Sequence, residues 1–141
     1  MANDAGDFSR SMSIATSGLR AQAGRMRVIS ENIANADSTA ATPGGDPYRR
    51  KVPTFSSELD RSLDAKTVAL GRIRPDPSAF RIKHDPGNPA ADAAGNVKYP
   101  NVNPVVEMTD MREAQRSYEA NLNIISATRR MIQRTLDILN A

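Results

Sequence analysis

The single histidine and the acidic residue beside it are the side chains of this sequence best suited to catalysis. His84 is followed directly by Asp85. Neighbours in an extended segment point to opposite sides, so these two cannot form the oriented base and carboxylate of a nucleophilic triad. We therefore interpret His84 as a turn residue that precedes Asp85-Pro86-Gly87. The sequence predicts no catalytic residue.

A metal site is the second chemical possibility. One histidine and no cysteine remove the usual ligands of zinc and iron, which leaves carboxylates and amides. Asp85, Asp92 and Asn96 fall in a glycine-containing loop that would suit weak calcium binding, but their spacing does not match an EF-hand loop. A solvated turn explains this loop better, so we expect neither a metal nor a cofactor.

A glycine pair followed by three successive cations occurs in TPGGDPYRRK, residues 42–51. The nucleotide-binding loop pattern is absent, and Pro43 and Pro47 remove two of the amide donors that a phosphate cradle needs. We interpret the segment as a turn that directs Tyr48 and the strip from Arg49 to Lys51 outward or across an interface. Arg and Tyr are favoured in contacts between chains.

Composition limits the class of protein. The 141 residues suit one domain, and 39% hydrophobic residues without any Trp indicate a thin core or apolar surface meant for other chains. The net charge of +3 lacks a dense basic cluster, so a nucleic acid partner is not indicated. No apolar run suits a cleaved secretory signal or a membrane span, so we expect no membrane insertion.

The elements that must carry any function begin with a heptad seam near the N-terminus, where apolar residues recur at steps of four and three. The seam comprises Phe8, Met12, Ala15, Leu19, Gln22, Met26, Ile29 and Ile33, with Gln22 as a polar interruption. It predicts a helix over roughly residues 8–36. Asn32 and Asn35 are interpreted as polar positions beside the seam, and Asn35 to Thr39 as the residues that turn the chain.

A second seam near the C-terminus has steps of three and four. It comprises Met108, Met111, Gln115, Tyr118, Leu122, Ile125, Arg129, Ile132, Leu136 and Leu139. Ile124, Met131 and Ile138 lie seven apart and are predicted to widen this stripe into a second buried face. Asn103 followed by Pro104 predicts a helix that starts there and runs to about residue 140.

Between the seams, eight of the nine prolines lie from Pro43 to Pro100, which excludes a continuous helix. Short alternating runs predict strands at residues 67–74, 79–83 and 96–99. The expected fold is mainly α with a small β insert. Long terminal helices would form an antiparallel coiled coil over residues 1–36 and 104–141, and residues 37–103 would form a Pro/Gly-rich loop with an antiparallel β segment.

The seams have more apolar positions than one helical hairpin needs. A hairpin with the insert at its tip accounts for part of the pattern, but polar seam residues such as Gln115 and Arg129 fit helices that pack against several neighbours. The residues predicted to pack against other subunits are Met12, Leu19, Met26, Ile29 and Ile33 in the N-terminal helix, and Met108, Met111, Tyr118, Leu122, Ile125, Ile132, Leu136 and Leu139 in the C-terminal helix.

The segments GLRAQAGRMRVISENIANADST and PGGDPYRRK resemble the N-terminal signature of the bacterial flagellar axial proteins, the rod and hook family. The segments PNVNPVVEMTDMREAQRSYEANLNIISATRRMIQRTLDILNA and DPSAFRIKHDPGNPAADAAGNVKYP are similar to its proximal rod members. The N-terminal signature and the turn after it contain Asn32, Asn35, Thr39, Tyr48 and Arg49. Ala40 to Pro47 lengthen the approach to Tyr48, as is usual in the proximal rod subfamily.

This resemblance implies a structural subunit and no enzyme. Its terminal helices would form the inner layer of a tubular rod that crosses the periplasm and transmits torque from motor to hook, as motility requires. The implied partners are other rod proteins, further copies of the chain and the flagellar type III export apparatus, which needs no cleaved signal. Because neighbouring subunits would cover the seams, we expect both ends to be wholly or partly disordered in the isolated chain.

Three alternatives remain open on the sequence alone. Another axial protein would share the N-terminal signature, although the central segment favours the proximal rod subfamily. A basic helical nucleic-acid binder is suggested by the pI of about 9.6 and by Arg20, Arg25 and Arg27, and would show salt-dependent DNA binding. A wall-degrading hydrolase would need carboxylates in a cleft, and the sequence offers no core to form one.

Overall fold

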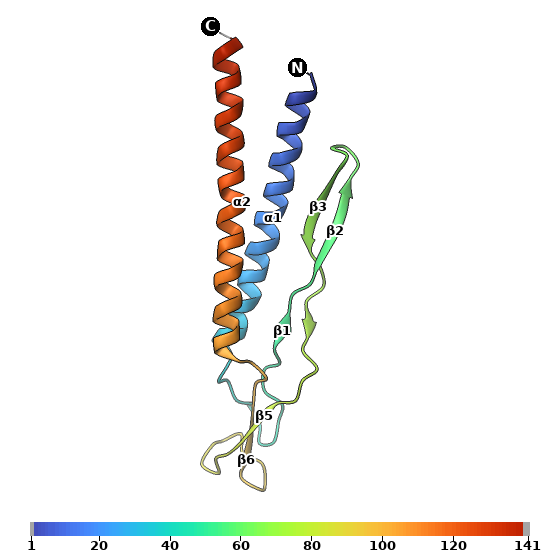
Figure 1. Cartoon of the computed structure of the whole chain (residues 1–141). Helices are drawn as coiled ribbons and strands as arrows, with labels where there is room; N and C mark the ends of the chain where they lie inside the picture. The colour runs from blue at the N-terminus through green and yellow to red at the C-terminus, as the bar shows by residue number, and fades with distance from the viewer. Residues whose placement is uncertain (1, 140–141) are drawn as a thin grey trace. The chain divides into compact units, whose positions relative to one another are not determined.

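The computed structural model describes the backbone of residues 2–139 and the side chains of residues 6–138. Two long helices, α1 (Ala2–Ala34) and α2 (Pro104–Leu139), stand at the two ends of the chain, and short strands lie between them in sequence (Figure 1). The strands are β1 (Lys51–Val52), β2 (Phe55–Asp60), β3 (Ala65–Leu70), β4 (Arg74–Pro75), β5 (Arg81–His84) and β6 (Asn96–Tyr99). The predicted mainly helical fold with a small antiparallel β segment is confirmed.

The chain divides into two compact units, and each helix contributes to both. The first unit contains the residues up to Met26, the segment Thr54–Arg72 and the residues from Glu113 onward. The second unit contains Arg27–Pro53 and Ile73–Arg112. Each unit therefore combines a piece of α1, a piece of α2 and strands from the insert.

In the first unit the two helix segments run antiparallel and approach each other closely. Gly18 of α1 lies against Asn121 of α2, and Arg25 Nη2 lies 3.7 Å from the carboxylate of Glu113. The numbering rises along one helix as it falls along the other. The buried apolar positions of these segments are small, and comprise Ala15, Ala21 and Ala114. Small side chains let helix backbones come close but bury little apolar area.

A β-hairpin completes the first unit (Figure 1). Strands β2 and β3 pair antiparallel from Phe55 opposite Leu70 to Asp60 opposite Ala65. The hairpin contacts α1, because Val68 N donates a hydrogen bond to Ser17 Oγ at 3.2 Å and Leu70 lies in the space above Gly24. α1 thus carries α2 on one side and the hairpin on another.

The second unit contains two further pairs of strands. β1 pairs with β4, and β5 pairs with β6 from Arg81 opposite Tyr99 to His84 opposite Asn96. Its buried apolar residues are Val28, Ile29, Ala36, Ala90, Val97 and Val102. Branched residues dominate this group, so the second unit has a larger apolar core per residue than the first.

The predicted start of α2 is confirmed, whereas both ends of α1 differ from the predicted residues 8–36. α2 starts at Pro104 as predicted, and Asn103 Oδ1 accepts a hydrogen bond from Val105 N at 3.1 Å, as expected of a capping residue. α1 starts at Ala2, before the predicted start at residue 8, since the segment ANDAGD has no proline and its acids favour the first turns of a helix. It ends at Ala34.

The predicted strands were correct in part. β6 covers the predicted residues 96–99, and β5 overlaps the predicted run at 79–83. The run predicted at residues 67–74 is interrupted between Leu70 and Arg74, so it forms β3 and β4 in different pairs. β1 and β2 were missed, because a strand such as FSSELD has few β-branched or aromatic residues and depends on its partner strand.

Candidate functional site

Asn32, near the end of α1, lies at the centre of a polar network in the second unit. Its side chain is 1% exposed. Nδ2 donates to the backbone O of Lys51 at 2.8 Å and to Glu107 Oε2 at 3.0 Å, and Oδ1 accepts from Tyr48 Oη at 2.8 Å and from Lys51 N at 2.9 Å. A side-chain amide has two donor hydrogens and two acceptor lone pairs, so every one is used.

The sequence placed Asn32 beside the seam but did not reveal that its side chain is buried and fully hydrogen-bonded. Its partners lie 16, 19 and 75 positions away in the chain, which local spacing cannot reveal. We call Asn32, Tyr48, Arg50, Lys51 and Glu107 the Asn32 cluster.

The Asn32 side chain takes the place of a neighbouring strand for β1. Lys51 uses both its backbone N–H and its backbone C=O to bind this one amide. On its other edge, β1 pairs with β4, with Lys51 opposite Pro75 and Val52 opposite Arg74. A two-residue strand has little stability of its own, so contacts on both edges explain how β1 stays extended here.

Glu107 supplies the buried charge of the cluster. It is 1% exposed, and Arg50 Nε donates to its Oε1 at 2.6 Å. The same guanidinium lies 3.3 Å from Asp76 Oδ2 and 3.8 Å from Asp110 Oδ2. A buried carboxylate requires a paired charge and hydrogen bonds. Arg50 and Asn32 provide them, one to each carboxylate oxygen.

Tyr48 is held as a neutral donor in this surrounding. Burial raises the pKa of its phenol to about 12, and the negative charges of Glu31 and Glu107 act in the same direction. Lys51 Nζ forms an ion pair with Glu31 and lies 5.7 Å from the centre of the Tyr48 ring. The phenol therefore keeps its proton, which it donates to Asn32.

The strip from Tyr48 to Lys51 was predicted to point outward or across an interface, but its side chains bind residues of the second unit. Arg49 Nη1 donates to the backbone O of Asp76 and of Ser78, each at 2.9 Å, and its guanidinium lies 4.1 Å from the centre of the Phe80 ring. The amide and hydroxyl of Ser78, and then Arg50, hold the pKa of the Asp76 carboxyl below its usual value. These side chains bind within the second unit because β1 runs beside their partners.

The residues considered for catalysis and metal binding serve the local backbone. His84 is the last residue of β5, opposite Asn96, and not a turn residue. Its Nδ1 lies 3.3 Å from Asn96 Oδ1. Asp92 Oδ1 accepts hydrogen bonds from Ala94 N at 2.8 Å and Asn96 N at 2.9 Å, as in an ordinary turn. Among the described residues, no group of three or more His, Cys, Asp or Glu could hold a metal ion.

The predicted packing residues of α1 lie in or beside the core. Ile29 is buried, and the partly buried ones are Met12, Leu19, Met26 and Ile33. Gln22, the polar residue of the seam, has an Oε1 that is buried without a hydrogen-bond partner among the described residues. Of the signature residues, Asn35, Thr39, Tyr48 and Arg49 are partly buried, and Asn35 Nδ2 donates to the backbone O of Glu31 at 2.8 Å.

The predicted packing residues of α2 divide into two groups. Those that are partly buried are Met111, Tyr118, Ile125 and Ile132. Those that are exposed are Met108 at 54%, Leu122 at 47% and Leu136 at 47%. The side chain of Leu139 lies outside the part of the chain that the structure describes.

The second buried face predicted for Ile124, Met131 and Ile138 was wrong for the single chain, because these residues are 48%, 47% and 76% exposed. The buried side of α2 carries Ala114 and Thr128, together with the partly buried Tyr118, Ile125 and Ile132. One neighbouring helix covers only one side of α2, and the glycine and alanines of α1 accept small side chains there. Apolar residues on both sides of that face remain in water.

Comparisons with known proteins point to one family. The family model "Flagella basal body rod protein" matches residues 12–41, and "Flagellar basal body rod FlgEFG protein C-terminal" matches residues 93–138. The chain is 53% identical to the "Flagellar basal-body rod protein FlgC" of Agrobacterium fabrum, over 95% of this chain and 96% of that protein.

More distant relatives carry the same name. The FlgC proteins of Bacillus subtilis and Salmonella typhimurium are each 38% identical to this chain, over 91% and 89% of it and 95% and 92% of their own lengths. These matches cover both helices and the insert, and they confirm the resemblance to proximal rod proteins drawn from the sequence. The chain belongs to the FlgC family of flagellar basal-body rod proteins.

Proposed function

We propose that this chain is a structural subunit of the proximal rod of the bacterial flagellar basal body. It assembles with copies of itself and with other rod proteins into the helical tube that transmits torque from motor to hook. The names of its relatives, all basal-body rod proteins, support this role, and place the chain among structural proteins rather than enzymes.

The observation that carries the proposal is the exposed apolar surface of α2. Leu122, Ile124, Met131, Leu136 and Ile138 are 47–76% exposed in the single chain. Burial of apolar surface contributes roughly 25 cal/mol per Å², and exposed apolar surface of this extent on one helix marks a contact with other chains. Assembly of a rod would cover it.

The parts of the chain then have separate roles. Residues 1–36 and 104–141 form the inner helical layer as a coiled coil, and residues 37–103 form the insert outside it. The predicted packing residues of both helices make the contacts between subunits. The chain reaches the periplasmic rod through the flagellar type III export apparatus without a cleaved signal. No helix in the described residues is long and apolar enough to cross a membrane.

Substitution of Leu122 by Asp tests this role in the bacterium that carries the chain. A carboxylate at an apolar contact must be desolvated, so we expect Leu122→Asp to abolish rod assembly and swimming. Asn123→Asp introduces the same group one position away, at an exposed polar residue, and should leave both intact. Normal swimming and complete basal bodies in Leu122→Asp would contradict the proposal.

A further inference from the structure

The outer edge of strand β2 is free in the single chain. Among the described residues β2 pairs with β3 alone, and Phe55 to Leu59 are exposed. The backbone groups of Ser57 point away from β3, because Val68, which lies opposite Ser57, donates its N–H to Ser17 Oγ instead. Backbone groups alternate in direction along a strand, so those of Phe55 and Leu59 also point outward. β2 therefore presents unpaired backbone donors and acceptors along one edge.

Strand β5 has a free edge of the same kind. Among the strands that the structure describes, it pairs with β6 alone, and all four of its residues are exposed. Asn96, which lies opposite His84, directs its backbone away from β5, since its N–H binds Asp92 Oδ1 and its C=O accepts from Asp92 N. His84 and Asn96 thus exchange no backbone hydrogen bonds, and the backbone groups of His84 and Ile82 point outward.

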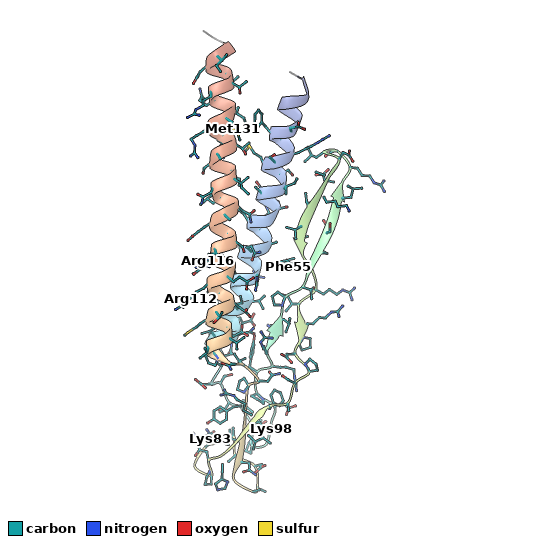
Figure 2. The ribbon with its side chains drawn as sticks, viewed as in Figure 1. Phe55, Lys83, Lys98, Arg112, Arg116 and Met131 are labelled. Atoms are coloured by element: carbon teal, nitrogen blue, oxygen red, sulfur yellow. The ribbon has the colours of Figure 1, made fainter. Side chains whose placement is uncertain are left out.

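The side chains beside these two edges have complementary character. β2 carries Glu58 and Asp60, and β5 carries Arg81 and Lys83; Figure 2 labels Phe55 on β2 and Lys83 on β5. Neither Glu58 nor Lys83 has an ion pair among the described residues. A free strand edge can bind a further strand through its backbone, and the side chains then select the partner.

Both strands also expose a large apolar residue, and there is space beside β5. Leu59 of β2 is 57% exposed and Ile82 of β5 is 69% exposed. An open pocket of about 570 Å³ adjoins β5, and its lining residues are Asp37, Arg81, Ile82, Lys83 and Tyr99. The single chain therefore leaves the side of β5 accessible to another segment.

We propose that β2 of one chain pairs antiparallel with β5 of a second copy, edge to edge. This inference rests on the proposed function, and it names two surfaces and the register of one contact in the rod. The pairing sets Asp60 opposite Arg81, Leu59 opposite Ile82, Glu58 opposite Lys83, and Ser57 opposite His84.

The register follows from the residue types and from the directions of the backbone groups. Leu59 and Ser57 point their backbone groups outward, and in this register they meet Ile82 and His84, which do the same. Two levels pair opposite charges and one pairs apolar side chains, and such cross-strand pairs stabilise a sheet. A shift of two positions keeps the backbone groups opposed, but it sets Ile82 opposite Ser57 or Arg61 and loses the apolar pair.

Two like edges fit each other less well. In the two registers with most overlap, β5 against a second β5 sets Lys83 opposite Lys83 or Arg81, and like charges directly opposite are destabilising. β2 contains no cation, so a second β2 leaves Glu58 and Asp60 without a partner. Within one chain, β2 and β5 belong to separate sheets. Each copy has one edge of each kind, so the contact does not close on itself and can repeat along an assembly.

Engineered disulfides test the register, because the chain has no cysteine of its own. Glu58→Cys with Lys83→Cys sets thiols at a level that exchanges no backbone hydrogen bonds in the proposed pairing. Opposed Cα atoms at such a level lie about 4.5 Å apart, which a disulfide can span. After mild oxidation of isolated basal bodies, we expect a ladder of covalent dimers and higher oligomers on a non-reducing gel.

Matched variants define the opposite outcomes. Ser56→Cys with Lys83→Cys moves one thiol by two positions on the same face of β2, to a diagonal distance of about 7 Å that a disulfide does not span. This pair and each single cysteine should stay monomeric. Monomers from the Glu58 and Lys83 pair in assembled basal bodies, a bond within one chain, or an equal ladder from the Ser56 pair overturn the inference and leave the proposed function standing. Absence of the unaltered chain from basal bodies overturns the proposed function itself.

A second measurement covers the case in which the cysteine pair does not assemble. A carbodiimide joins a carboxylate to an amine in direct contact as an amide, so it acts on basal bodies of the unaltered chain. We expect mass spectrometry of the cross-linked dimer to identify a peptide joined from Glu58 to Lys83, and Glu58→Gln to remove it. Absence of this link from cross-linked basal bodies that contain the chain overturns the inference.

Discussion

At the scale of the residue, the buried side-chain amide of Asn32 connects three segments of the second unit. Asn32 connects the end of α1 to β1 through Lys51 and Tyr48, and to the start of α2 through Glu107. Both kinds of hydrogen-bonding group, donor and acceptor, are required in one short side chain. A substitution that keeps the size of Asn32 but removes its donor hydrogens should therefore lower stability far more than the same substitution at an exposed position.

Asn32→Asp should lower the free energy of unfolding by about 3 kcal/mol. The new carboxylate loses both donor hydrogens and lies beside Glu107, so two buried negative charges face each other. Chemical denaturation followed by circular dichroism measures the change. Asn123→Asp makes the same replacement at an exposed position of α2 and should alter stability little. Equal effects at the two positions would contradict the role assigned to Asn32.

Tyr48 makes the stability of the second unit depend on pH in the alkaline range. The pKa of its phenol is 10.0 ordinarily and about 12 in the folded chain, so above pH 10 the unfolded chain loses this proton first. The stability that the shift contributes is complete below pH 10 and is lost as pH rises through 12. The difference in unfolding free energy between the unaltered chain and Tyr48→Phe should therefore shrink over that range. A difference that stays constant from pH 9 to 12 would argue against it.

At the scale of the element, glycines allow the first unit to assemble around α1. A Cβ added at Gly18 would lie 2.8 Å from Asn121 Nδ2, and one added at Gly24 would lie 2.7 Å from Leu70 Cδ2. These distances are shorter than normal contacts of a Cβ atom. The missing Cβ of Gly18 therefore leaves space for α2, and the missing Cβ of Gly24 leaves space for the β2–β3 hairpin. A glycine in a helix interior costs about 1 kcal/mol relative to alanine, and close packing of both neighbours offsets that loss.

Gly18→Leu should destabilise the contact of α1 with α2 by about 1–3 kcal/mol, because the new side chain has no space beside Asn121. Thermal unfolding of the helical circular dichroism signal measures this effect. Gly6→Leu is the matched control, since nothing lies within 4 Å of a Cβ added there. That variant should unfold at the same temperature as the unaltered chain or higher. A lower temperature for Gly6→Leu than for Gly18→Leu would refute the packing described here.

The helices could be predicted from sequence because their signals are local. Heptad spacing, the absence of proline and the pair Asn103-Pro104 all act within a few residues of the element they define. The sides of the helices were harder to predict. Leu122 and Leu136 follow the seam but stay exposed, whereas Tyr118, Ile125 and Ile132 of the same seam are partly buried. The Asn32 cluster joins segments that no local pattern connects.

At the scale of the whole molecule, the single chain is unevenly stabilised. The second unit has an apolar core of branched side chains and the Asn32 cluster, whereas the first unit has buried alanines between helices with exposed apolar flanks. Rod assembly would supply the contacts that the first unit lacks. We therefore expect the ends of the chain to become fully ordered only when neighbouring subunits bind.

Limited proteolysis of the purified chain in dilute solution should show this difference. We expect trypsin to cut first at Arg129, Arg130 and Arg134, which are exposed on α2, while a fragment that contains the Asn32 cluster persists. The same sites should be protected in isolated rods. Stable, protease-resistant helices at both ends of the monomer, with full helical circular dichroism, would contradict the expectation that assembly orders them.

Because the Asn32 side chain takes the place of a neighbouring strand, positions 32 and 51 should vary differently among related sequences. Asn32 contacts residue 51 through that residue's backbone alone, so this contact needs an N–H at position 51 but no particular side chain. Across related genes, the contact with Asn32 should tolerate any residue except proline at position 51, where only the ion pair with Glu31 favours a cation, while position 32 stays asparagine. One conserved asparagine would thus do what the backbone of a whole neighbouring strand does in an ordinary sheet.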